Sequence, residues 1–388
     1  MSTGDLLRVG LLFSGSGVTG AQETSQLRGV LQALEQVNAQ GGIGGREVVP
    51  IRYDPQSKDE LFRAFADRLV RDDQVNVIFG GYRSSSRKIM LPIVEKHDRL
   101  LFYPQLCEGF EFSEHIIYGG AAPNQNGLQL ADFMARNFGA RVYMIGSRYV
   151  YPYECNRNMQ ELILQKDNGA VVGERYLDLD ATFEDFLDVM DDVSKKKPDF
   201  IFSSVIGHTI SYLYQAYARL KLDPGTVPIG SLNTSEVELA AMGVQFGAGH
   251  YTSAPYFQTV STSENRLALQ DFHNRYGDGL STDMNWEAGF YQFHLFATAC
   301  AAAGSDALVP LKRELLGSEY AAPQGRVRVD GKNQHTGLYP RIGRALPNGQ
   351  FDIVWESREM VAPDPYMSTQ PIGDWLTKLT TAEHVDGL

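Results

Sequence analysis

Tyrosine and hydroxyl side chains gather where the predicted strands end, and these residue types suit binding of a small polar molecule. Aromatic clusters occur at Tyr103-Pro104, at Tyr149–Tyr153 and at Pro255–Phe257. A tyrosine ring offers a flat apolar wall with a hydroxyl at its edge. Tyr149 and Tyr151 are two residues apart in a predicted extended stretch, so we expect them to face the same side. The pattern predicts a small, nearly closed pocket, although such rings also occur in a core or at a lobe interface.

A second candidate is the loop Gly80-Gly81-Tyr82-Arg83-Ser84-Ser85-Ser86, which joins a predicted strand end to a predicted helix start. A helix N-terminus presents unpaired N–H groups and the positive end of the helix dipole. Such a site holds a carbonyl oxygen or an anion. A serine here also serves as an N-cap, and both roles are compatible at the carboxyl end of a strand.

Further polar residues end the predicted strands of the second half or open the helices that follow. They are Ser204, Thr234 and Glu236, with N-capping as the alternative role of Thr234. Glu108 and Glu154 lie near aromatic turns, where each either accepts N–H bonds from an amide ligand or is a surface acid. Asn233-Thr234-Ser235 is an N-glycosylation sequon, which carries no weight in a cytoplasmic bacterial-type protein.

Motifs for catalysis are weak. The run Gly15–Gly20 matches G-x-G-x-x-G, but the acid expected about 20 residues later is missing, and the nearest strand-end acid is Asp54. The sequence contains no G-x-S-x-G, H-E-x-x-H or C-x-x-C motif. Cys107, beside Glu108, would need a partner that the sequence does not reveal in order to act as a nucleophile. We therefore predict a protein that is not an enzyme and holds no metal and no cofactor.

Composition narrows the class of partner. The 388 residues carry a formal net charge of −12, which disfavours direct binding to nucleic acid or to an anionic membrane. Three cysteines far apart suggest reduced thiols. No apolar run approaches the roughly 18 residues of a membrane span. The start, MSTGDLL, lacks the features of a signal peptide, so we expect a cytoplasmic protein, or a periplasmic or lipid-anchored one if a leader was removed.

Apolar periodicity predicts strands and helices in alternation, which calls for parallel sheets with helices on both faces. The first half has predicted strands at 9–13, 47–53, 75–79 and 100–103, and predicted helices at 20–39, 61–70 and 86–97. The second half repeats the rhythm, with strands at 142–145, 170–177, 200–204 and 227–231 and helices at 126–138, 153–165, 183–196 and 209–220. Extended stretches at 115–118, 250–256 and 335–339 are interpreted as crossings between the halves.

Several stretches together resemble the type I periplasmic-binding-protein superfamily, over about Val9 to Tyr366. They are GLLFSGSGVTG, NAQGGIGGRE, YPQLCEGFEFS, IIYGGAAPNQN, IGSRYVYPYECN, APYF and APQGRVRVD. Within the superfamily they are similar to AmiC-type amide sensors and to urea- or short-chain-amide-binding proteins. The resemblance implies an α/β fold of two Rossmann-like lobes with parallel sheets, joined by three crossover strands. We expect an N-terminal lobe at 7–121 plus 256–330, a C-terminal lobe at 122–255 plus 331–362, and a tail at 363–388.

The same resemblance implies a function and a set of site residues. It implies a cytoplasmic sensor of a small neutral amide, which restrains an amidase-type operon through an AmiR-type antiterminator partner, and a homodimer or higher homo-oligomer. Acetamide, propionamide, butyramide and urea are the expected ligands. The alternatives are a substrate-binding subunit of an ABC transporter for urea or short amides, and an enzyme of the same fold. Motif matching places Tyr82, Ser84, Tyr103, Tyr149, Tyr151, Ser204, Val205 and Thr234 at the ligand.

The sequence departs from the family pattern at three positions. Cys107 stands where relatives often carry tyrosine, which we expect to widen the pocket or change its polarity. Arg83 precedes the pocket serine, and Tyr153 follows the proline of IGSRYVYPY. Both are expected to alter the size of ligand accepted.

Overall fold

The computed structural model describes residues 6–367, which divide into two units of similar size. Unit 1 comprises 6–107, 111–120 and 262–338, and unit 2 comprises 108–110, 121–261 and 339–367. Apart from the short excursion at 108–110, the chain passes between units three times, after Gly120, Ser261 and Leu338. These boundaries differ from the expected ones, since 256–261 fall in unit 2 and 331–338 in unit 1. Of the predicted tail at 363–388, residues 363–367 belong to unit 2, and the rest lies outside the described residues.

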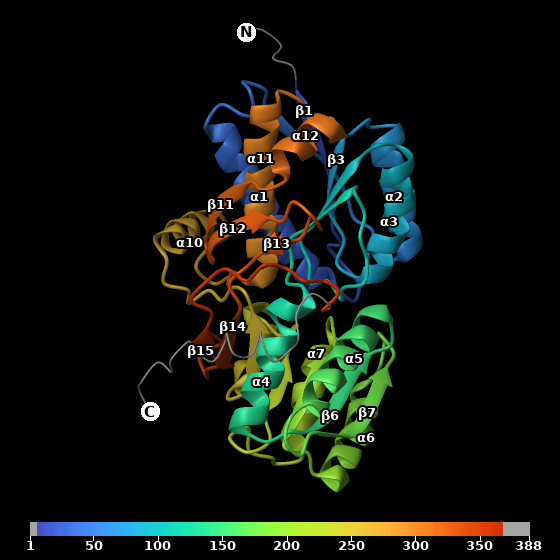
Figure 1. Cartoon of the computed structure of the whole chain (residues 1–388), viewed down its shortest axis with the longest axis vertical. Coiled ribbons are helices and arrows are strands. Elements are labelled where there is room, and N and C mark those ends of the chain that lie inside the picture. Colours follow the sequence, from blue (N-terminus) through green and yellow to red (C-terminus); the bar gives the residue numbers. More distant parts are fainter. Residues whose placement is uncertain (1–5, 368–388) are drawn as a thin grey trace. The chain divides into compact units, whose positions relative to one another are not determined.

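Unit 1 is built on a parallel five-stranded sheet in the order β2-β1-β3-β4-β5 (Figure 1). The strands are β1 (Leu7–Leu12), β2 (Val48–Tyr53), β3 (Val77–Gly80), β4 (Leu100–Tyr103) and β5 (Ile116–Tyr118). The stretch 115–118, which we interpreted only as a crossing, is a full member of the sheet. β5 pairs in parallel with β4, with Tyr118 opposite Tyr103. The chain leaves for the other unit only after this strand.

The helices of unit 1 cover both faces of this sheet. They are α1 (Gly20–Ala39), α2 (Asp59–Arg71), α3 (Ser84–Lys96), α10 (Ser263–Tyr276), α11 (Met284–Ala303) and α12 (Leu308–Leu315). α2 and α3 lie together on one side of the sheet, and α1 and α11 on the other (Figure 1). An antiparallel sheet of β11 (Glu319–Ala322), β12 (Gly325–Val329) and β13 (Thr336–Gly337) completes the unit.

In unit 1, α1 and α11 pack closely against each other. Most of α11 is buried, as expected for a helix that is apolar on nearly every side. A glycine on each helix allows close approach: a Cβ on Gly29 would overlap the carbonyl oxygen of Trp286, and one on Gly289 would lie 2.5 Å from that of Gln26. The two backbones are therefore nearly in contact, and the pairing is sterically specific.

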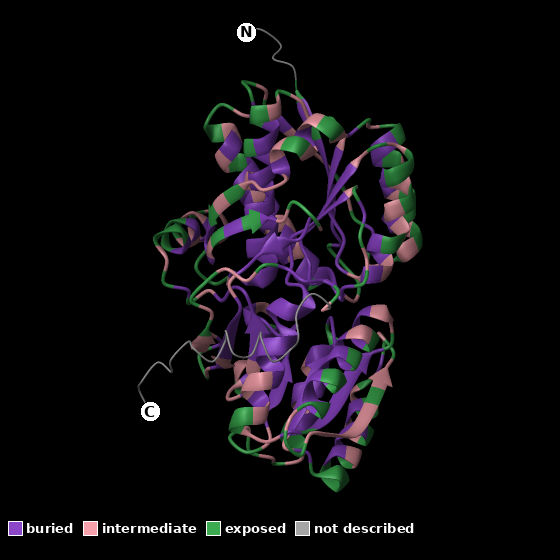
Figure 2. Ribbon diagram, viewed as in Figure 1, coloured by how far each residue is buried: buried purple, intermediate pink, exposed green. Residues whose placement is uncertain are grey.

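Unit 2 is built on a seven-stranded sheet in the order β15-β14-β10-β9-β8-β6-β7. Its strands are β6 (Arg141–Ser147), β7 (Ala170–Leu177), β8 (Phe200–Ser204), β9 (Ile229–Ser231), β10 (Tyr251–Ala254), β14 (Arg341–Ala345) and β15 (Phe351–Glu356). The predicted crossing at 250–256 is instead β10, which pairs in parallel with β9 and antiparallel with β14. Most strand residues of both units are buried (Figure 2).

The helices of unit 2 follow its strands in the expected alternation. They are a 3-10 turn at Pro123–Gln125 and the helices α4 (Gly127–Asn137), α5 (Val150–Leu164), α6 (Phe183–Lys196), α7 (Thr209–Arg219), α8 (Glu236–Met242) and α9 (Val244–Gly247). α4 packs on α5, and α6 packs on α7. None of the helices in residues 6–367 has the length and hydropathy that a bilayer crossing needs.

The α1–α11 contact gives a prediction for stability. Gly29→Ala adds helix propensity worth roughly 1 kcal/mol, but the new methyl group would overlap the backbone of α11. Because backbone cannot move aside as a flexible side chain does, the clash dominates, and we expect a net loss of about 1–3 kcal/mol. Urea unfolding measures the change. Gly127→Ala, at the start of α4 with nothing within 4 Å of the new Cβ, is the control. Equal stability of the two variants would contradict the close packing of α1 on α11.

Candidate functional site

In unit 1, parallel pairing brings the carboxyl ends of β1, β3 and β4 to one edge of the sheet. Leu12 of β1 lies opposite Gly80, and Phe79 of β3 lies opposite Phe102. The loops that leave this edge carry the residues that the sequence singled out, from Ser14 to Thr19, from Tyr82 to Ser86 and from Pro104 onward. Ligands of open α/β sheets bind outside such edges.

The loop after β3 has the conformation that its glycines permit. Gly80 and Gly81 have φ values of 157° and 84°, and a Cβ on Gly80 would overlap the carbonyl oxygen of Leu12. This turn directs the chain into α3, which begins at Ser84. The Tyr103 hydroxyl donates a 2.6 Å hydrogen bond to the carbonyl oxygen of Tyr82. The structure thus brings Tyr82 and Tyr103 together, beside the buried Ser84.

The serine N-cap considered for this loop is not formed. Arg83 occupies the N-cap position, with no side-chain hydrogen bond to the helix end. Ser86 instead donates to the carbonyl oxygen of Arg83 at 2.7 Å, and Ser85 donates to Asp59 at 3.2 Å. Ser84 is therefore the first helical residue and not the cap.

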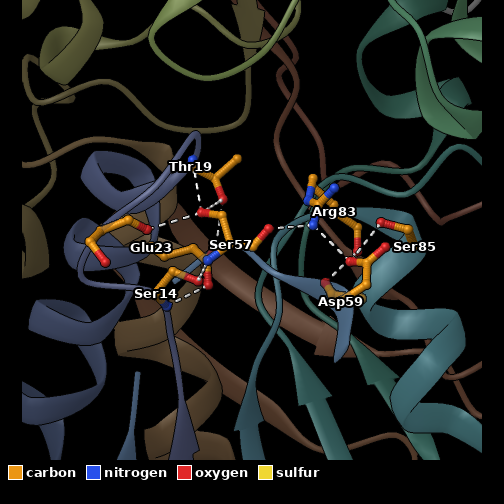
Figure 3. A network of polar contacts seen from close by, with 9 residues as sticks. Ser14, Thr19, Glu23, Ser57, Asp59, Arg83 and Ser85 are labelled. Carbon is orange, nitrogen blue, oxygen red and sulfur yellow. Dashed lines mark hydrogen bonds and ion pairs between the residues drawn. The ribbon is translucent and has the colours of Figure 1, made fainter. Parts of the chain in front are cut away.

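Both arginines at this edge are paired with carboxylates of unit 1. Arg83 lies 2.7 Å from Asp59 and also donates to the carbonyl oxygen of Ser57 at 2.6 Å (Figure 3). The fully buried Arg87 lies 2.5 Å from Glu111, and its guanidinium lies 4.8 Å from the centre of the Tyr103 ring. Internal ion pairs thus balance the positive charge beside Tyr82, Ser84 and Tyr103, which reduces its attraction for an anionic ligand.

A polar network fixes the loop after β1 (Figure 3). Glu23 accepts hydrogen bonds from the Ser14 N–H at 2.7 Å and from the Thr19 hydroxyl at 2.6 Å. The Thr19 hydroxyl lies 2.9 Å from that of Ser57, which donates to the carbonyl oxygen of Ser16. Burial raises the pKa of the Glu23 carboxyl to about 7, although the hydrogen bonds from Thr19 and Ser14 oppose the shift. This carboxyl therefore titrates near neutral pH.

The same contacts weigh against a dinucleotide site in the Gly15–Gly20 loop. The N–H of Gly15 donates to Asp54 at 3.0 Å, and the N–H of Thr19 donates to the Ser57 hydroxyl at 3.1 Å. The N–H groups of Gly15 and Thr19 are thus bound by side chains of unit 1, and the Asp54 carboxylate beside Gly15 would repel a pyrophosphate. A phosphate-binding loop needs those N–H groups for its ligand.

In unit 2, the carboxyl ends of β6, β8 and β9 also meet at one edge, since Gly146 lies opposite Ser204 and Ser203 lies opposite Ser231. Tyr149 and Tyr151 follow β6 at this edge. The prediction that both lie in an extended stretch is wrong, because α5 begins at Val150 and Tyr151 lies in its first turn. The rings still lie together, with centroids 6.3 Å apart and planes 26° from parallel.

Two predicted site hydroxyls of unit 2 bond within the unit. The Ser204 hydroxyl donates to the Asn156 side chain at 2.8 Å. The Thr234 hydroxyl donates to the Ser231 hydroxyl at 2.9 Å and lies 3.0 Å from that of Tyr214. Thr234 is not a helix cap, since Ser235 caps α8. The buried Val205 follows Ser204, with its N–H bonded to Ser203 at 3.3 Å.

The turn after β9 holds a buried asparagine, Asn233, that the sequence pattern did not single out as a candidate site residue. Asn233 is 1% exposed, and within the described chain neither its Oδ1 nor its Nδ2 has a hydrogen-bond partner. The sequence marked Asn233 only as part of a sequon. Asn233 lies two residues beyond the end of β9, as Tyr82 and Tyr149 lie two residues beyond the ends of β3 and β6. Of these three strand ends, only that of β9 was predicted at the observed residue.

The carboxylates considered as ligand contacts differ in their surroundings. Glu108 is buried, and its contacts assign it to unit 2 although β4 belongs to unit 1. Glu236 is buried and accepts a 2.8 Å hydrogen bond from the Gln258 N–H. Glu154 forms a surface ion pair with Arg157 at 2.8 Å, in agreement with the surface alternative. Cys107 packs in the core of unit 1 with Tyr103 and Tyr118.

Comparison with known proteins shows which family the chain matches. A family model described as a periplasmic binding protein domain matches residues 7–372. Among solved structures, the chain is similar to an ABC-transporter solute-binding protein from R. palustris in complex with benzoate, with a TM-score of 0.83 and 18% identity over 93% of this chain and 99% of that one.

It is also similar to the branched-chain amino acid binding protein LivJ from Streptococcus pneumoniae in complex with isoleucine, with a TM-score of 0.79 and 16% identity over 92% and 100% of the two chains. A curated protein named limonene hydroxylase, from Geobacillus stearothermophilus, is 29% identical over 127 residues. That match spans 33% of this chain and only 23% of the relative's length.

The raised pKa of Glu23 predicts how stability depends on pH. Between pH 4.5, the ordinary value, and about pH 7, the unfolded chain loses this proton while the folded chain keeps it. The unfolded state then binds fewer protons, so this group makes stability fall as pH rises through that window, by up to about 3 kcal/mol. Glu23→Gln removes the effect, because an amide side chain does not titrate in this range. We therefore expect a flatter profile in urea unfolding between pH 5 and pH 8.

The exposed Glu47 of the same unit supplies the control variant Glu47→Gln, which should keep the wild-type slope. If Glu23→Gln and the wild type show the same change in unfolding free energy over this range, Glu23 does not titrate there.

Proposed function

The chain belongs to the periplasmic binding protein family, and from this premise we propose that it is a non-catalytic receptor for a small aliphatic amide. The observation that carries the proposal is the balanced charge at the unit 1 edge, where Arg83 and Arg87 are held by Asp59 and Glu111. A carboxylate ligand binds best to a cation that its own protein leaves available. Balanced charge beside tyrosine and serine residues favours an uncharged, hydrogen-bonding ligand instead.

The chemistry of an amide fits the residue types at both edges. An amide offers a carbonyl acceptor and an N–H donor, and burying either without a partner costs about 1–3 kcal/mol. In the proposed site, Tyr82, Ser84 and Tyr103 of unit 1 and Tyr149 and Tyr151 of unit 2 are the ligand residues. The tyrosine rings act as apolar walls that limit the ligand's chain length, at about 0.8 kcal/mol for each buried methylene group. Val205 adds apolar surface, while Glu108 accepts a ligand N–H. Ser204 and Thr234 are proposed as ligand residues in the remaining wall.

In this proposal the receptor is a cytoplasmic sensor. The ligand shifts the equilibrium between arrangements of the two units by its difference in affinity for them, and an antiterminator-type partner protein reads the change. A transport receptor is the second candidate, favoured by the solute-binding proteins of ABC transporters to which the fold is similar. Fractionation of cells that express the natural gene separates the two roles.

A ligand panel tests the class of ligand. We expect acetamide, propionamide, butyramide or urea, in large excess, to raise the melting temperature by a few degrees, because a ligand that binds only the folded state stabilises it by mass action. Benzoate and isoleucine serve as matched negative ligands in the same scanning fluorimetry plate. A shift with benzoate or isoleucine and none with any amide would contradict the proposal.

Substitutions test the site itself. Ser84→Ala and Tyr149→Ala should each weaken amide binding at least about tenfold, or roughly 1.4 kcal/mol, in calorimetry. To test the Tyr103 hydroxyl, Tyr103→Phe is preferable to Tyr103→Ala. Removing this fully buried ring would destabilise unit 1 by about 3–5 kcal/mol. Ser194→Ala, on the exposed surface of α6, is the control and should bind as the wild type does. Unchanged affinity in both site variants would exclude these residues from the site.

A further inference from the structure

The side chain of Asn233 has hydrogen-bonding capacity that its own chain does not use. An asparagine side chain presents one carbonyl acceptor and two N–H donors. Asn233 is 1% exposed, and among the described residues neither end has a hydrogen-bond partner. Such a group is costly to bury, so each case in a native protein calls for an explanation.

Two other buried asparagines of unit 2 behave differently. Asn124 donates to the carbonyl oxygen of Ala362 at 2.8 Å and accepts from the Asp364 N–H at 2.7 Å. Asn156 accepts from Ser204 at 2.8 Å and donates to Glu174 at 3.3 Å. These two amides use both ends to join segments of the chain. The Asn233 side chain joins no segment within residues 6–367, so a structural role there does not account for it.

The turn that carries Asn233 is nevertheless fixed. The Ser231 hydroxyl oxygen accepts from the N–H groups of Asn233 and Thr234, each at 3.1 Å. The Thr234 hydroxyl also donates to Ser231 and contacts Tyr214, as described above. The backbone is thus held on both sides of the Asn233 side chain. A polar group on a fixed backbone binds with little loss of conformational entropy.

The position of Asn233 is also that of a ligand contact. It lies two residues beyond the end of β9, at the same sheet edge as the loops that follow β6 and β8. Two buried carboxylates, Glu236 and Glu238, lie three and five residues further along. Their presence in the same segment disfavours a negatively charged ligand.

We propose that Asn233 recognises the polar end of the ligand and selects a primary carboxamide or urea over a carboxylate. Its Nδ2–H donates to the ligand carbonyl oxygen, and its Oδ1 accepts from the ligand NH₂ group. This pairing uses both ends of both amides. A carboxylate would satisfy only Nδ2 and would place an oxygen against Oδ1. The inference rests on the proposed function. It narrows the ligand to molecules in which a carbonyl carbon also carries an NH₂ group, so that a hydrogen-bond acceptor and a donor lie side by side.

Calorimetry with propionamide and propionate, which have nearly the same shape, tests this selection. The wild type should bind propionamide and not propionate. Asn233→Ala and the near-isosteric Asn233→Asp should each weaken propionamide binding at least about tenfold, since both remove the donor to the carbonyl oxygen. Asn137→Ala, at an exposed asparagine of α4, should bind as the wild type does.

Thermal unfolding without ligand separates a binding role from a structural one. Because the Asn233 side chain bonds to no described residue, Asn233→Ala should keep or raise the melting temperature of the ligand-free protein while losing the shift that propionamide causes. A lower melting temperature with unchanged propionamide affinity would overturn the inference and leave the proposed function standing. A wild type that binds no amide would overturn both.

Discussion

Parallel strand pairing is the constraint on which the candidate site depends. In a parallel sheet every strand runs the same way, so the loops that leave the carboxyl ends come together however far apart they are in the sequence. In unit 1 this unites the loops after β1, β3 and β4, and in unit 2 those after β6, β8 and β9. The side chains that project from the faces of each sheet contribute to the core. The loops at these edges lie outside the sheet, where a ligand could contact them.

At the sheet edge of unit 1, the charged side chains pair with one another within the unit. The guanidinium groups of Arg83 and Arg87 lie against carboxylates of unit 1, and Lys88 adds a second contact to Glu111 at 2.6 Å. Removing one member of a buried pair costs about 3–5 kcal/mol, because the other charge is left unbalanced. The pairs therefore fix the loops and at the same time make them poor anion sites. In the proposed function, hydroxyl, amide and aromatic groups recognise the ligand.

Much of the fold was predictable because it follows from local pattern. The apolar period gave α1 and α6 with their observed bounds, and the run Leu100–Tyr103 matched β4. Strand roles were less predictable, because pairing is a long-range property: 115–118 and 250–256 both resemble connections, yet β5 and β10 lie within sheets. The start of α5 was also missed, since two tyrosines in alternation suggest a strand more than a helix.

The candidate site was predictable in position more than in detail. Strand ends are visible in the sequence, so the loops with Tyr82, Tyr149 and Thr234 were found. Which side chain of a loop is already occupied depends on contacts with distant segments, such as Ser204 with Asn156. The sequence pattern could therefore not show that the Thr234 hydroxyl is engaged within unit 2 while the side chain of its neighbour Asn233 has no partner among the described residues.

The packing of α1 on α11 has a consequence for biosynthesis. The two helices begin at Gly20 and Met284, so α1 leaves the ribosome long before its partner is made. At typical rates of synthesis, about 5–20 residues per second, the wait lasts roughly 13 to 50 s. Throughout that interval, α11 is not yet present to pack on the face of α1 around Gly29. The side chains of Ser25, Gln32 and Gln36, which bond to α11 and its N-cap in the folded protein, thus remain without these partners until α11 has been synthesised.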